Sequence, residues 1–163
     1  MRGHLLGCLM LALLVPAPQI GAQTVSDPKA DCETLLNAAV PFAEQMLKSR
    51  GEFFPFGRAM RANGELVSVQ GYDGRERPPS TDVIRLIKDQ FVRAANTAQF
   101  KATALVYDVR ITLPSDGSKS DAIAVSLNHR EDYSVIVIFP YKIEAGQLSI
   151  DSPIAQPGEA DIF

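Results

Sequence analysis

The sequence contains no tryptophan, only two cysteines and only two histidines. Cys8 and His4 fall within an N-terminal segment that we expect to be removed, which leaves Cys32 and His129. A single cysteine excludes an internal disulfide. One cysteine and one histidine cannot fill a tetrahedral zinc shell without several carboxylates. We therefore predict no metal and no cofactor, and we expect stability to come from a packed core.

Established catalytic motifs are absent as well. The chain has no G-x-S-x-G, no H-E-x-x-H, no G-x-x-x-x-G-K-[ST] and no paired C-x-x-C. It also has no basic run, and its formal net charge of −3 argues against nucleic acid as a partner. These absences favour a binding domain over an enzyme.

Residues 1–22 have the features of a secretory signal peptide. Arg2 supplies a positive start, and the apolar run Leu5–Val15 is too short to span a membrane. A small residue, Ala22, stands at the expected cut. Cleavage there leaves a mature chain that begins at Gln23, is periplasmic or secreted, and has no stable membrane span. An uncleaved N-terminal anchor is the alternative.

The remaining 141 residues (163 − 22) are enough for one domain, able to bury about two-thirds of its unfolded surface. We interpret residues 23–30 as a short polar linker and residues 31–143 as a single α+β domain. Residues 144–163 look like a C-terminal tail, with room for one short strand at 148–150.

Two helices are predicted, because apolar residues recur at three- and four-residue spacing over 31–50 and 80–96. Pro41 in the first lacks an N–H group, so that helix should kink or restart there. Ser80 or Thr81 should cap the second.

Five strands complete the predicted element order, α-β-β-α-β-β-β. Asn63-Gly64 predicts a hairpin with a type I′ turn. That hairpin would set Met60 opposite Val67 and Arg58 opposite Val69. The later strands are expected at 101–113, 122–128 and 133–141.

The strand at 133–141 is apolar on both faces, which is typical of a strand buried on both sides. We therefore place it in the middle of a single, mainly antiparallel five-stranded sheet with strand order 2-1-5-4-3. This topology is similar to that of profilin-like and roadblock-like folds, although a fold does not fix a function.

Residues 129–132, His-Arg-Glu-Asp, lie where the last predicted hairpin must turn. We expect His129 to pair with Ser134, which sets Leu127 opposite Ile136 and Val125 opposite Ile138 and exposes the charged residues between them. The alternative is a catalytic histidine with an orienting carboxylate. Its weak candidates are His129, Asp108 and Asp132. We favour the structural role and assign no catalytic residue.

Two polar surfaces could bind a ligand or a second protein. The less apolar face of the sheet should mix polar and aromatic side chains, as binding surfaces do. Its candidate binding residues are Arg58, Asp108, Arg110, Asn128, Phe139 and Tyr141. The loop 71–80 could bind an anion through Tyr72, Asp73, Arg75 and Arg77. We favour instead a loop whose glycines make tight turns and whose charges are solvated.

Four short motifs together resemble a family of small bacterial α+β proteins with no known activity. They are Gly51-Glu52-Phe53, Pro55-Phe56-Gly57, Tyr107-Asp108-Val109-Arg110 and Phe139-Pro140-Tyr141. The resemblance covers about residues 33–143 and implies no reaction. Many relatives look cytoplasmic, so the export signal departs from the family pattern and weakens any cytoplasmic role transferred by analogy.

The sequence thus predicts an exported, non-catalytic domain that binds a protein or a small molecule. One alternative is a periplasmic hydrolase that uses His129. The other is an inhibitor or immunity-type protein that blocks the active site of another protein.

Overall fold

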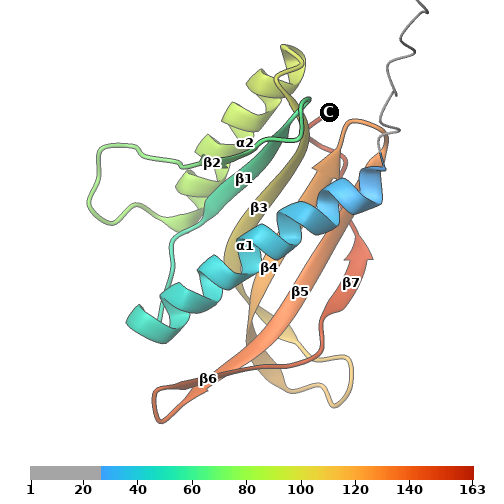
Figure 1. Ribbon diagram of the computed structural model, residues 1–163. Helices are drawn as coiled ribbons and strands as arrows, with labels where there is room; N and C mark the ends of the chain where they lie inside the picture. Colours follow the sequence, from blue (N-terminus) through green and yellow to red (C-terminus); the bar gives the residue numbers. More distant parts are fainter. Residues whose placement is uncertain (1–26) are drawn as a thin grey trace, which may run out of the picture.

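The computed structural model describes residues 27–163, so the predicted signal peptide and the first part of the predicted linker lie outside the described residues. Within residues 27–163, two helices and a seven-stranded antiparallel sheet form an α+β fold (Figure 1). The helices are α1 (Pro28–Arg50) and α2 (Ser80–Asn96). The strands are β1 (Phe56–Arg61), β2 (Leu66–Val69), β3 (Phe100–Thr112), β4 (Lys119–His129), β5 (Tyr133–Glu144), β6 (Gln147–Ile150) and β7 (Ile154–Pro157).

Helix α1 begins three residues before the predicted start, because Asp27 caps it. The Asp27 carboxylate accepts hydrogen bonds from the N–H groups of Lys29 (3.1 Å) and Ala30 (3.2 Å). Gly51 ends the helix with φ 73° and donates to the Leu47 carbonyl at 2.9 Å. The helix does not restart at Pro41, which lies inside it at an exposed position. The Asn37 carbonyl, which lacks a hydrogen bond from Pro41, is on this exposed side and can bond to water.

Helix α2 has the predicted length and buries Val83, Ile87 and Phe91 on one face. The predicted cap is wrong. Pro79 stands at the cap position, and no side chain there accepts a hydrogen bond from the first turn. Asp82 supplies the favourable negative charge in that turn.

The predicted strand order is wrong, because β1 pairs with β3 and not with β5. The observed order is β2-β1-β3-β4-β5-β6, with β7 also paired to β5. The C-terminal segment occupies the other edge of β5, through Ile150 opposite Tyr141 and Ile154 opposite Ile138. The predicted short strand at 148–150 is present as β6, whereas β7 has no counterpart among the predicted elements.

The predicted hairpin registers are each wrong by one residue. Arg58 lies opposite Ser68 and Met60 opposite Leu66. His129 lies opposite Tyr133, and Val125 opposite Val137. Each turn therefore has a three-residue loop whose last residue adopts positive φ, namely Gly64 (87°) and Asp132 (52°).

The two-residue turn with positive φ at both positions, predicted for Asn63-Gly64, occurs elsewhere. It joins β5 to β6 at Ala145 (50°) and Gly146 (78°), where Glu144 pairs with Gln147. This conformation is that of a type I′ turn, which suits the twist of the flanking strands.

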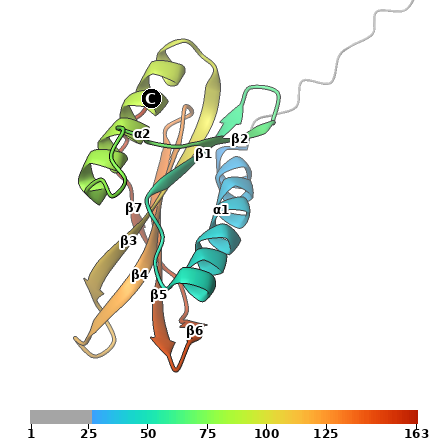
Figure 2. The same cartoon turned by 90° about the vertical axis from the view of Figure 1, so that its left-hand side faces the viewer.

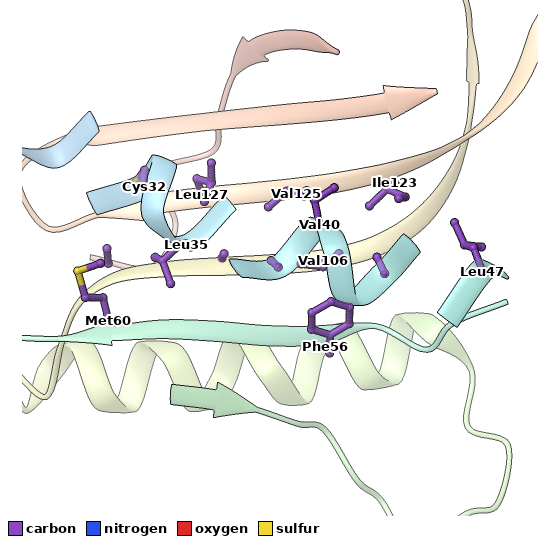
Figure 3. Close-up of a cluster of buried hydrophobic side chains, with 14 of the residues drawn as sticks. Cys32, Leu35, Val40, Leu47, Phe56, Met60, Val106, Ile123, Val125 and Leu127 are labelled. Carbon is purple, nitrogen blue, oxygen red and sulfur yellow. The ribbon is translucent and has the colours of Figure 1, made fainter. Parts of the chain in front are cut away.

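The two helices cover opposite faces of the sheet, as the edge-on view shows (Figure 2). The α1 face buries side chains from the helix and from β1, β3 and β4 (Figure 3). Its labelled members are Cys32, Leu35, Val40, Leu47, Phe56, Met60, Val106, Ile123, Val125 and Leu127. The α2 face buries Ala59, Val69, Val83, Ile87, Phe91, Phe100, Leu105 and Ile162. Ile162 lies in the predicted tail, so that segment contributes to the core.

Close approach of α2 to β1 requires a glycine. A Cβ placed on Gly57 would lie 2.7 Å from Cζ of Phe91 and 2.9 Å from Cγ2 of Ile87.

Among residues 27–163, no helix is long and apolar enough to cross a membrane.

Candidate functional site

His129 ends β4, and its side chain is completely buried. Its Nδ1 accepts a hydrogen bond from the N–H of Glu131 at 3.1 Å. That bond places the proton of the neutral ring on Nε2, which lies 3.2 Å from Oδ2 of Asp31. Both ring nitrogens are engaged within the protein, so His129 has no nitrogen available to a substrate.

Asp31 is the centre of a largely buried cluster. Its Oδ2 also lies 2.7 Å from Nζ of Lys101, on the first residues of β3. The cluster joins the first turn of α1 to β3 and to the turn between β4 and β5. Sequence reasoning missed Asp31 as the partner of His129, because 98 residues separate the two.

Cys32 follows Asp31 and is buried. Burial, with a smaller contribution from the charge of Asp31, raises the pKa of its thiol from 9.0 to about 12. The thiolate is the reactive form, so Cys32 is a poor nucleophile. The residues that the structure describes contain no cluster of histidine, cysteine and carboxylate side chains able to hold a metal ion.

The carboxylates proposed as partners of a catalytic His129 do not form a site with it. Asp108 is six residues along β3 from Ala102, the residue that pairs with His129. At the rise of an extended strand this separation is about 20 Å. Asp132 occupies the last position of the turn and is exposed. Asp31 fills the orienting position instead.

The predicted binding face is divided by the observed register. Arg58, Asp108, Arg110, Phe139 and Tyr141 lie in the phase of the sheet that faces α1. Asn128 lies in the opposite phase, where its side chain accepts a hydrogen bond from Ser134 at 3.3 Å. The structure therefore does not bring the six residues together.

Asp108 and Tyr141 do form a pair on the α1 face. The Tyr141 hydroxyl donates to Oδ1 of Asp108 at 3.0 Å. Burial raises the pKa of Tyr141, and the nearby carboxylate of Asp108 raises it further. Loss of surrounding water also raises the pKa of Asp108, and the hydrogen bond from Tyr141 opposes that shift. Neither Asp108 nor Tyr141 lines the cleft that opens at the C-terminal end of α1.

A cleft of about 410 Å³ opens between the C-terminal end of α1 and the loop that joins β2 to α2. Figure 1 shows where these two segments run in the fold. We call this opening the aromatic cleft. Its lining residues are Phe42, Met46, Arg50, Glu52, Phe53, Phe54, Pro55, Phe56, Gln70, Gly71, Tyr72, Arg75, Glu76, Pro78 and Val83. The volume lies within the range of about 300–1,000 Å³ that is usual for small-molecule sites.

The lining of the aromatic cleft combines a packed floor with exposed rings. Phe56 is buried, and Phe42 meets it edge to face with ring centroids 4.9 Å apart. Phe54 and Tyr72 are 49% and 77% exposed. Large apolar side chains that remain exposed around a concave surface favour a ligand site.

Arg75 lines the cleft from the loop, but carboxylates of the protein already neutralise its positive charge. Its Nε donates to Asp73 at 2.7 Å, and its Nη2 donates to Asp82 at 2.6 Å. Hydrogen bonds from Arg75 are the main reason that the pKa values of both aspartates are lowered. The anion-binding loop considered from Tyr72, Asp73, Arg75 and Arg77 therefore loses its central cation to internal carboxylates.

One sequence signal could have pointed to the cleft. The segment Glu52–Phe56, which leads from the end of α1 into β1, contains three phenylalanines and a proline in five residues. A short connection does not need so many aromatic side chains in order to turn.

Comparison with protein-family models, with curated proteins and with solved structures finds no match to this chain. The family resemblance drawn from the short motifs stays a prediction.

Proposed function

We propose that this protein is an exported, non-catalytic domain that binds a small molecule in the aromatic cleft. The observation that carries the proposal is the cleft itself, which has the volume of a small-molecule site and exposes Phe54 and Tyr72 at its surface. Contact of these apolar rings with water is unfavourable in free energy, and a ligand that covered the rings would remove this unfavourable contribution.

The hydrolase alternative has less support. A general base must reach the proton that it removes, directly or through one water. The side chain of His129 is 0% exposed and bonds to Asp31 and to the Glu131 N–H. These contacts favour a structural role for the histidine.

Binding in the cleft can be tested with the protein purified after expression of the full chain. A fragment library screened by saturation-transfer NMR should yield ligands, and Phe54→Ala should weaken the best of them about tenfold, equivalent to about 1.4 kcal/mol. Phe163→Ala is the matched control, because Phe163 is 40% exposed and does not line the cleft. Equal affinity of wild type and Phe54→Ala for every ligand would refute the proposal.

Export can be tested separately. The intact mass of the protein recovered from its native host should correspond to a chain that starts near Gln23, found outside the cytoplasm. The expectation rests on the apolar run Leu5–Val15 followed by a small residue at Ala22. Recovery of the full-length chain from the cytosol would contradict it.

A further inference from the structure

We infer that the ligand of the aromatic cleft is an organic cation with an apolar or aromatic body. The inference rests on the proposed function, because it assumes that the cleft is a ligand site. Three properties of the lining support it, namely the charges bonded to Arg75, the unpaired carboxylates at the rim, and the exposed aromatic rings.

The first property is the internal compensation of Arg75. Two carboxylates, Asp73 and Asp82, bond to this one guanidinium, while Arg85 contacts Asp82 more loosely at 3.6 Å. An anionic ligand would have to displace these carboxylates or lie beside them. A cation meets no such opposition.

The second property is the state of the remaining charges. Glu52 and Glu76 are exposed and form no ion pair within the part of the chain that the structure describes. Arg50 is the one guanidinium of the lining that forms no ion pair among residues 27–163, and Arg77, next to Glu76 in the loop, does not line the cleft. Arg50 lies in the last turn of α1, where the partial negative charge of the helix terminus offsets its positive charge. The rim is therefore complementary to positive charge.

The third property is the aromatic surface, whose ring faces attract cations. One ring of the cleft already receives an internal cation, since Cζ of Arg58 lies 6.0 Å from the centroid of the Phe42 ring. Phe54 and Tyr72 offer exposed rings, and no arginine or lysine among residues 27–163 lies over either of them. A ligand whose ammonium group lay near these rings and the two glutamates would gain both the cation–π and the charge attraction. The apolar body of that ligand would cover the surface around Phe53 and Val83.

The test compares three probes of similar size, benzyltrimethylammonium, benzyl alcohol and phenylacetate, titrated by NMR into the protein expressed as the full chain. We expect the cation to bind about 3- to 30-fold more tightly than the neutral probe, the range that a cation–π contribution supports. Phenylacetate should bind most weakly. Added salt should weaken the binding of the cation, because exposed charges are screened.

Charge variants give the decisive result. The double variant Glu52→Gln/Glu76→Gln should weaken benzyltrimethylammonium several-fold, whereas Arg50→Gln should strengthen it. Benzyl alcohol should respond to neither. Glu131→Gln is the matched control, since Glu131 is exposed in the turn between β4 and β5, beside the first turn of α1, whereas the cleft lies at the other end of that helix.

The outcomes separate this inference from the proposed function. Preference for phenylacetate, or no preference among the probes, overturns the cation inference but leaves the cleft as a ligand site. Failure of all three probes to bind at millimolar concentration also overturns it, while library ligands that depend on Phe54 would still support the proposed function. Cation binding that is unaffected by both the glutamate variants and Phe54→Ala refutes both.

Discussion

Phe91→Ala should lower the free energy of unfolding by about 3–5 kcal/mol, the range typical of truncating a buried aromatic side chain. Phe91 is 1% exposed and lies on the face of α2 that packs against the sheet. Its ring fills the space left by the missing side chain of Gly57, where an added Cβ would lie only 2.7 Å away. Truncation leaves a cavity between two rigid elements, and neither can move to close it without losing other contacts.

Denaturant unfolding followed by circular dichroism measures this loss. Phe163→Ala serves as the control, because Phe163 is exposed at the C-terminus and its truncation should cost under about 1 kcal/mol. A cost at Phe91 no larger than that at Phe163 would mean that α2 does not pack on β1 as described.

Asp31→Ala should lower the free energy of unfolding by about 2–4 kcal/mol. Its carboxylate accepts from His129 at 3.2 Å and pairs with Lys101 at 2.7 Å, so its removal leaves a buried imidazole N–H and a largely buried ammonium without this acceptor. Removing one member of a fully buried pair costs about 3–5 kcal/mol. We expect somewhat less here, because Asp31 and Lys101 keep 18% and 17% of their side-chain surface exposed.

The matched control is Asp89→Ala, which removes an exposed carboxylate from α2 that forms no ion pair among residues 27–163. Its unfolding free energy should stay within about 0.5 kcal/mol of wild type. Equal effects of the two substitutions would contradict the role of Asp31 as a structural link between α1, β3 and the β4–β5 turn.

His129→Gln should also lower the free energy of unfolding, but it should leave ligand binding in the aromatic cleft unchanged.

Helix and strand locations were largely predictable from periodicity. The stripe of Val83, Ile87 and Phe91 identified the buried face of α2, and the alternation from Lys101 to Leu113 identified β3 to within one residue at each end. These patterns are local, so they require only that one side of each element be buried. The helix start at Pro28 was missed because Asp27, which caps the helix, was interpreted as part of a polar linker.

Registers were less predictable, because a shift of one residue depends on a single backbone conformation. Either a two-residue or a three-residue loop is compatible with Asn63-Gly64, and the choice depends on whether Asn63 adopts positive φ. In the structure Gly64 does and Asn63 does not. At the other hairpin Asp132, a residue type that tolerates this conformation, takes the same role. The one-residue shift at this hairpin placed Asn128 on the opposite face of the sheet from Phe139 and Tyr141.

Strand order could not be deduced from composition. The apolar content of β5 suggested the centre of the sheet, yet β4 is buried continuously from Ala122 to His129. Several β4 residues are small or polar, among them Ala124, Ser126 and Asn128, and such side chains are compatible with burial where packing is close or a hydrogen bond is available. Burial therefore reflected the neighbours of each strand more than its own hydrophobicity.

By itself, the sequence determined the α+β class, two helices, the positions of the main strands and the absence of a disulfide within residues 27–163, because these depend on local pattern and on residue counts. Only the tertiary structure decided the partner of His129 and the position of the candidate ligand site. Asp31 and His129 are joined across 98 residues. The aromatic cleft draws on α1, the segment before β1, the loop after β2 and the first turns of α2. A concave surface made of four separate segments leaves no periodic trace in any one of them, since each residue is placed there by the packing of the others.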